Sequence, residues 1–170
     1  MADRSQSESA LVQFSERLTN SAAFGTLFRE GMDLVEETAA YLDGDGRSEA
    51  RALERSVSLT YATESMRLTT RLMQLASWLL LHRAVKEGEM TLTQANREKT
   101  KVKLSAADPG PEEMIAKLPQ QLQDLIARSM NLQSRVRRLD TSIHTPATGR
   151  APIGNPLVPQ LNRLKAAFEQ

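Results

Sequence analysis

Residues 118–143 read LPQQLQDLIARSMNLQSRVRRLDTSI, and this stretch decides the fold class of the chain. Its apolar positions follow one another in alternating steps of four and three residues, which is the spacing of a heptad seam along an α-helix. The seam consists of Leu118, Leu122, Leu125, Ser129, Leu132, Val136, Leu139 and Ile143. Pro119 stands at the start, where a helix tolerates proline. The stretch therefore predicts a helix over Gln120–Ile143 that buries one continuous stripe.

Two earlier stretches also carry apolar residues at helical spacing. The first predicts a helix over Ser21–Leu42, with its first residue as N-cap. The segment Asp43–Gly46 (DGDG) is expected to stop this helix with residues that tolerate left-handed backbone. The second stretch predicts a helix over Ser48–Glu87, capped by its first residue and ended by Gly88. Because it contains no Gly or Pro, this helix would run unbroken for about 60 Å.

Within that helix, the segment Leu72–Leu81 is apolar on nearly every side and must be covered on every side. The two flanking helices would span only about 33 and 36 Å, so they could leave part of the segment bare. An exposed apolar patch of that size is typical of an interface, and we therefore expect a homodimer. The alternative is a monomer in which residues 1–20 and 89–118 supply the cover. Leu72, Leu75, Trp78, Leu79 and His82 are the residues expected in the bundle core or at the dimer interface.

Together these stretches predict an all-α fold, a three-helix bundle with a long central helix. Residues 1–20 form a polar lead-in, residues 21–143 the bundle domain, and residues 144–170 a flexible tail that holds four of the seven prolines. Thr91 and Gln94 predict a capping box that opens a short helix before the last long one. The tail ends in a small amphipathic patch, which we expect to bind protein as a tethered ligand. The patch consists of Leu157, Leu161, Leu164 and Phe168.

The composition leaves few chemical functions open. The chain has no cysteine, and its two histidines, His82 and His144, lack the spacing of metal ligands. Asp43 and Asp45 begin a calcium-loop pattern, but Ser48 stands where that loop requires glycine. Neither a phosphate-binding loop nor a nucleophile motif is found. We therefore expect no catalytic residue, no metal, no cofactor and no enzymatic activity.

The charge pattern leaves one alternative function open. The formal net charge is +1, yet basic residues gather at Arg97–Lys103 and Arg135–Arg138. No aromatic side chains accompany them for stacking on bases, so we do not expect nucleic-acid binding. A small helical DNA-associated regulator is kept as the alternative. The polar N-terminus does not have the pattern of a signal peptide, and Leu72–Val85 is too short and too polar to span a bilayer, so we expect a cytoplasmic protein without a membrane partner.

Three stretches resemble one known family. They are FREGM followed by LVEETAAYLDG within Phe28–Gly44, SMRLTTRLMQLASWLLLHRAV at Ser65–Val85, and LIARSMNLQSRVRRLD at Leu125–Asp140. They resemble the RcdA (regulator of CtrA degradation) family of bacterial adaptors for the ClpXP protease. The second stretch is the specific one, because generic bundle helices rarely combine RLTTR with ASWLLL. The resemblance covers residues 24–143.

The resemblance implies a helical bundle that dimerises and carries no catalytic residue. It implies delivery of cell-cycle regulators to ClpXP, together with a response-regulator adaptor that binds the protease. Further implied partners are cargo transcription regulators and a cyclic-di-GMP-binding protein, all gathered at a cell pole. The family offers no short catalytic motif, so no active residue is carried over to this chain.

Overall fold

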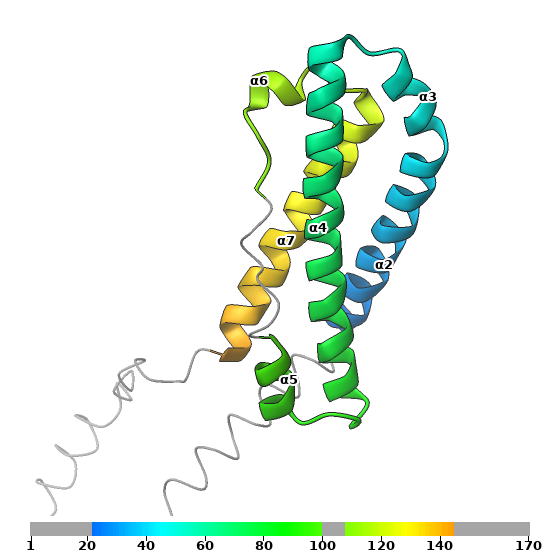
Figure 1. Ribbon diagram of the computed structural model, residues 1–170. Coiled ribbons are helices and arrows are strands. Elements are labelled where there is room, and N and C mark those ends of the chain that lie inside the picture. Colours follow the sequence, from blue (N-terminus) through cyan, green and yellow to red (C-terminus); the bar gives the residue numbers. More distant parts are fainter. Residues whose placement is uncertain (1–21, 100–107, 145–170) are drawn as a thin grey trace, which may run out of the picture.

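The computed structural model describes residues 22–99 and 108–144. They form the helices α2 (Ala22–Asp43), α3 (Asp45–Arg51), α4 (Arg55–Lys86), α5 (Leu92–Lys99), α6 (Glu112–Ile115) and α7 (Gln120–His144). No strand occurs among these residues. The three long helices α2, α4 and α7 pack against one another, with α4 in front of the other two in Figure 1. The predicted all-α bundle with a long central helix is confirmed.

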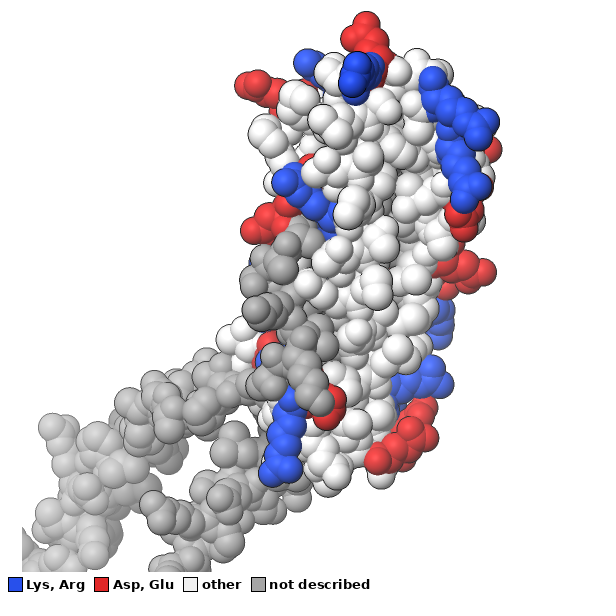
Figure 2. All heavy atoms as spheres, viewed as in Figure 1, with Lys and Arg blue, Asp and Glu red and all other residues white. Residues whose placement is uncertain are grey.

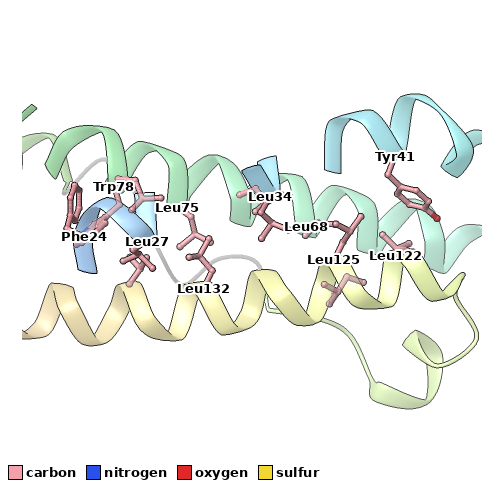
Figure 3. Packing of buried hydrophobic residues seen from close by; sticks show 14 of the residues in the cluster. Phe24, Leu27, Leu34, Tyr41, Leu68, Leu75, Trp78, Leu122, Leu125 and Leu132 are labelled. Atoms are coloured by element: carbon pink, nitrogen blue, oxygen red, sulfur yellow. The ribbon is translucent and has the colours of Figure 1, made fainter. Parts of the chain in front are cut away.

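The core lies along the line where the three long helices meet. Figure 3 shows side chains of α2 and α4 pointing toward side chains of α7, among them Leu34, Leu75 and Leu132. The heptad seam of α7 supplies one wall of this core, since seven of its eight residues are buried and Leu139 packs against them in part. The spacing in residues 118–143 therefore identified the buried face of α7.

The prediction of one unbroken helix over Ser48–Glu87 was wrong. The chain forms α3 first, leaves the helix at Ala52, and begins α4 only at Arg55. Ser48 therefore lies inside α3 and does not cap α4, whose N-cap position is Glu54. The break has a tertiary cause, because α3 packs on the end of α2. There the Tyr41 hydroxyl donates to Glu49 Oε2 at 2.6 Å.

The predicted stop at Asp43–Gly46 consists of a single turn residue, Gly44. The backbone of this residue is not left-handed, in contrast to the expectation. Gly44 has φ −108° and ψ −112°, and α3 starts at the next residue. Among the described residues, Gly88 is the glycine with positive φ, at 76°. It ends α4 as predicted, because its N–H donates to Val85 O at 3.1 Å and that of Glu89 donates to Ala84 O at 3.0 Å. This pair of bonds is a Schellman motif, which satisfies carbonyls at the helix end.

The segment after α4 begins as predicted. The Thr91 N–H donates to Gln94 Oε1 at 3.0 Å, and the Gln94 N–H donates to Thr91 Oγ1 at 3.2 Å. These two bonds form the capping box at the start of α5. The short helix α6, which follows Pro111, was not predicted. The lead-in at residues 1–20 and the tail residues 145–170 lie outside the described part of the chain, whereas His144 ends α7.

Candidate protein-binding surface

The most distinctive surface feature lies on α4. Among the described residues, the large hydrophobic side chains that remain exposed are Leu59, Met66, Met73 and Leu80, at 71, 72, 66 and 52% exposure. They are spaced seven residues apart along one helix. Because seven residues are close to two helical turns, the four side chains form a single line, which we call the α4 stripe.

The α4 stripe runs through a face without charge. At about 100° per residue, nine positions between residues 59 and 84 lie within about 60° of its centre line. They are Leu59, Ala62, Met66, Thr69, Thr70, Met73, Ser77, Leu80 and Ala84. Figure 2 shows the same side of the molecule, with a band over α4 that lacks charged side chains and with Lys, Arg, Asp and Glu at its margins and ends. An exposed helix face of this length ordinarily carries charges, so its composition points to an interface.

Several hydroxyl groups along this side of α4 already have partners within the helix. Thr63 Oγ1 donates to Leu59 O at 3.0 Å, Thr69 Oγ1 to Ser65 O at 2.8 Å, and Ser77 Oγ to Met73 O at 2.8 Å. A hydroxyl that donates to the carbonyl four residues earlier needs no water molecule as acceptor. The face can therefore be covered by another helix without leaving these donors unsatisfied, which removes a main cost of burial.

The five residues expected in the core or at a dimer interface lie on the opposite side of α4. Leu72, Leu75, Trp78, Leu79 and His82 are all buried within one chain. The Trp78 and His82 rings stack at 3.9 Å, and the Trp78 indole N–H donates to Asp140 Oδ1 at 2.8 Å. Asp140 also pairs with Lys99, at 2.6 Å between Nζ and Oδ2, which ties α5 to α7. Within Leu72–Leu81, the strongly exposed large side chains are those of the α4 stripe.

The sequence analysis did not identify Leu59 and Met66 as candidate interface residues, although the sequence contains a signal for them. Both residues stand at the seven-residue interval that leads to Met73 and Leu80. The segment Leu72–Leu81 drew attention because it is apolar all round, and this property does not say which side faces solvent. The fixed interval of the four large side chains distinguishes the two faces.

A buried polar network holds the upper part of the bundle together. Arg71 is fully buried, and its Nη1 donates to Ser129 Oγ at 2.7 Å. Glu64 Oε1 accepts from Arg67 Nη1 at 2.6 Å and from the Gly110 N–H at 3.0 Å. Burial lowers the pKa of the Arg71 guanidinium, and the nearby Glu64 carboxylate opposes this shift. The network explains the serine in the α7 seam and connects α4 to α7 and to the loop before α6.

Two cations along α7 are paired with acids of α2. Arg128 Nη1 lies 2.8 Å from Glu37 Oε2, and Arg135 Nη1 lies 2.7 Å from Glu30 Oε2. These pairs reduce the positive field that a DNA-binding surface needs. The Arg135–Glu30 pair weakens the alternative function drawn from Arg135–Arg138 at one of the three arginines of that segment. Part of the other basic segment, residues 100–103, lies outside the described residues.

Two hollows on the described surface are open to solvent. One of 430 Å³ lies between α2 and α4 and is lined in part by Phe24, Phe28 and Met32. The Arg83 guanidinium lies 4.8 Å from the centroid of the Phe28 ring at this site. Residues 22–99 and 108–144 contain no cluster of His, Cys, Asp or Glu suited to a metal ion. In the same residues, no helix combines the length and the apolar character needed to cross a membrane.

The described residues thus define a helical-bundle protein whose most distinctive surface is an uncharged helix face. Comparison with known proteins gives the family. The family described as "Protein of unknown function (DUF1465)" matches residues 15–168, and the chain belongs to this family, which is the RcdA-like family. The predicted membership is confirmed.

A solved structure agrees with this assignment. The chain is similar to RcdA from Caulobacter crescentus CB15, whose crystal structure it matches with 48% sequence identity and a TM-score of 0.62. The match covers 75% of this chain and 96% of that chain. No protein with a curated function matches the chain.

Proposed function

We propose that this protein is a non-enzymatic adaptor that binds other proteins and helps to deliver cell-cycle regulators to the ClpXP protease. The observation that carries the proposal is the 48% identity to RcdA over almost the whole of that chain. At this level of identity the surfaces that bind partners, and not only the fold, are expected to be related. The uncharged face of α4 supports a protein-binding role, because it offers an extended apolar contact with few unsatisfied polar groups.

The proposed mechanism is a gain in local concentration. An adaptor that holds the cargo and the protease system at once converts their weak encounter into an intramolecular one. For flexible connections the effective concentration can reach the millimolar range. The bundle acts as the rigid part. The tail patch Leu157, Leu161, Leu164 and Phe168, which lies outside the described residues, is proposed as the tethered ligand.

The proposed partners follow from the same family relationship. They are ClpXP with a response-regulator adaptor, cargo transcription regulators, and a cyclic-di-GMP-binding protein that extends the same hierarchy. The protein is proposed to act in the cytoplasm as a homodimer and to gather at a cell pole with these partners.

A reconstituted degradation assay tests the proposal. It contains ClpXP, the response-regulator adaptor, the cyclic-di-GMP-binding protein and several candidate cargo regulators, and it records the loss of each cargo. Adding the full-length protein is expected to accelerate degradation of at least one cargo. An unchanged rate for every cargo would contradict the proposal.

Two variants locate the cargo-binding part. Ending the chain after His144 removes the tail, whereas replacing the four apolar residues of the tail patch by serine keeps the linker. Both variants are expected to lower the rate if the patch binds cargo, with the bundle still folded by circular dichroism. If the shortened chain is fully active, the adaptor function stands and the cargo must bind the helices.

A further inference from the structure

The hollow of 430 Å³ between α2 and α4, which we call the α2–α4 hollow, has an apolar floor that the described helices leave open. Its floor consists of Phe24, Phe28 and Met32, which follow one another at four-residue intervals along α2. Phe28 and Met32 are only partly buried, although the ring centroids of Phe24 and Phe28 lie 6.4 Å apart. Arg83 of α4 forms a wall, since its guanidinium lies 4.8 Å from the Phe28 ring centroid and pairs with Glu87 at 2.9 Å. A strip of large apolar side chains beside a charged wall is the kind of surface that an amphipathic helix covers.

The lead-in, which lies outside the described residues, supplies a matching strip next to this hollow. α2 begins at Ala22, and the floor of the hollow starts two residues later. The lead-in contains three large apolar residues at intervals of three and four, which a helix would place on one face: Leu11, Phe14 and Leu18. The three residues Thr19–Ser21 connect this strip to α2. A connection of that length is typical of two helices that pack antiparallel.

The two strips are in register for an antiparallel pair. When the chain reverses at Thr19–Ser21, residues about equally distant from the turn come to lie side by side. The pairs formed in this way are Leu18 with Phe24, Phe14 with Phe28, and Leu11 with Met32. The two strips span roughly 10 and 12 Å along their helices, so the three contacts can form together. We infer that residues 8–18 form a helix that docks in the α2–α4 hollow of their own chain.

The charge of the rim favours the lead-in over the tail as the occupant. The rim of the hollow carries three cations and two acids, namely Arg29, Arg83, Lys86, Asp33 and Glu87. Residues 8–18 have the opposite balance, because they contain two acids, Glu8 and Glu16, and one cation, Arg17. Between residues 157 and 168, by contrast, the tail contains two cations and no acid. An excess of cations on the rim attracts the first segment and repels the second.

The length of the connection favours the lead-in as well. Three residues join Leu18 to α2, whereas the twelve residues 145–156 separate α7 from the tail patch. Figure 1 shows the start of α2 and the ends of α4 and α7 at the same end of the bundle, so both segments leave the bundle near the hollow. Closing the shorter loop costs less conformational entropy. A docked lead-in therefore keeps the tail patch out of this hollow, so that the patch stays available for the cargo of the proposed function.

Two pairs of cysteine substitutions test whether the lead-in lies on the hollow. The chain has no cysteine, so Leu11→Cys with Met32→Cys provides two thiols that face each other in the docked form. Leu11→Cys with Glu30→Cys is the matched control, because position 30 lies about 160° around α2 from position 32 and at nearly the same distance along the chain from position 11. A short thiol cross-linker should close the first pair about tenfold faster or more, since docking raises the effective concentration of one thiol at the other. The product should be a cross-linked single chain, formed at a rate independent of protein concentration.

The other outcomes of this reaction overturn the inference. Equal rates for the two pairs would mean that the lead-in has no preference for the hollow. Covalent dimers in place of cross-linked single chains would mean that the lead-in fills the hollow of a second copy and not its own. The degradation assay decides the adaptor function separately, because it does not depend on where the lead-in lies.

Hydrogen exchange on the full chain tests the same contact without cysteine. The amides of residues 11–18 should exchange about tenfold more slowly, or slower still, than those of an unfolded segment. Met32→Glu places a carboxylate on the apolar floor and should abolish this protection, with the bundle still folded by circular dichroism. Phe14→Glu places the same charge on the lead-in, outside the core of the bundle, and should act alike. Ala39→Glu, at an exposed position of α2 beyond the hollow, is the matched control and should retain the protection.

Three results of the exchange experiment would overturn the inference. The first is an absence of protection at residues 11–18 in the natural chain. The second is protection that survives Met32→Glu in a folded bundle, because the lead-in would then dock elsewhere. The third is protection of residues 157–168 that Met32→Glu removes, which would assign the hollow to the tail.

Discussion

Leu75 and Leu80 stand five positions apart on α4 and have opposite environments. Leu75 is 1% exposed and contributes to the core between α4 and α7, whereas Leu80 is 52% exposed and belongs to the α4 stripe. In sequence both are leucines within the same apolar segment. Their different roles come from the helical phase set by the neighbouring helices, which single-residue hydrophobicity does not contain.

Truncation of these two leucines gives a matched pair. Leu75→Ala is expected to lower the free energy of unfolding by about 2–5 kcal/mol, because it removes buried methyl groups and leaves a cavity. Leu80→Ala should change it by less than about 1 kcal/mol when one chain is measured alone. Urea unfolding at low protein concentration, below the range of association, measures both values. Equal losses for the two variants would contradict the assigned faces of α4.

Elements differ in how far local sequence determines them. The periodicity of residues 118–143 predicted α7 within one residue of its end, because its seam meets the core at every turn. The break between α3 and α4 was missed, because Ala52–Glu54 contains no Gly or Pro to mark it. Its cause lies in contacts distant in sequence, and tertiary contacts override helix propensity at such places. The short helix α6 was not predicted, because so few residues cannot show a periodic pattern.

The junction of α2, α3 and α4 depends on Gly46. A Cβ atom at this position would lie 2.7 Å from the backbone oxygen of Tyr41 and 2.6 Å from the Tyr61 hydroxyl. Gly46→Ala is therefore expected to cost about 1–3 kcal/mol by overpacking, despite the better helix propensity of alanine. Gly25→Ala is the control, since no atom lies within 4 Å of its added Cβ. It should stabilise the protein by up to about 1 kcal/mol.

Thermal or chemical unfolding measures both glycine variants. The expected result is a lower midpoint for Gly46→Ala and an equal or higher midpoint for Gly25→Ala. If Gly46→Ala were as stable as the natural sequence, the close contact of α3 with Tyr41 and Tyr61 would be incorrect, and so would the physical reason given for the break before α4.

At the scale of the whole molecule, the sequence predicted the helical bundle and its family but only part of the candidate binding surface. Periodicity shows which residues share a face, and the α4 stripe became visible only when packing assigned the other faces to the core. Met73 and Leu80 lay within the segment that was expected to be partly bare, whereas Leu59 and Met66 did not. The tail patch at Leu157–Phe168 lies outside the described residues and stays a prediction.

The central claim is that this protein acts by bridging cargo and protease, and one titration tests it most directly. ClpXP, the response-regulator adaptor, the cyclic-di-GMP-binding protein and one cargo are held at fixed concentrations, and the initial rate of cargo degradation is recorded as this protein is added. A bridging molecule should raise the rate to a maximum and then lower it, because excess adaptor binds cargo and protease in separate complexes. A rate that never changes, or one that rises to a plateau and stays there at large excess, would contradict bridging.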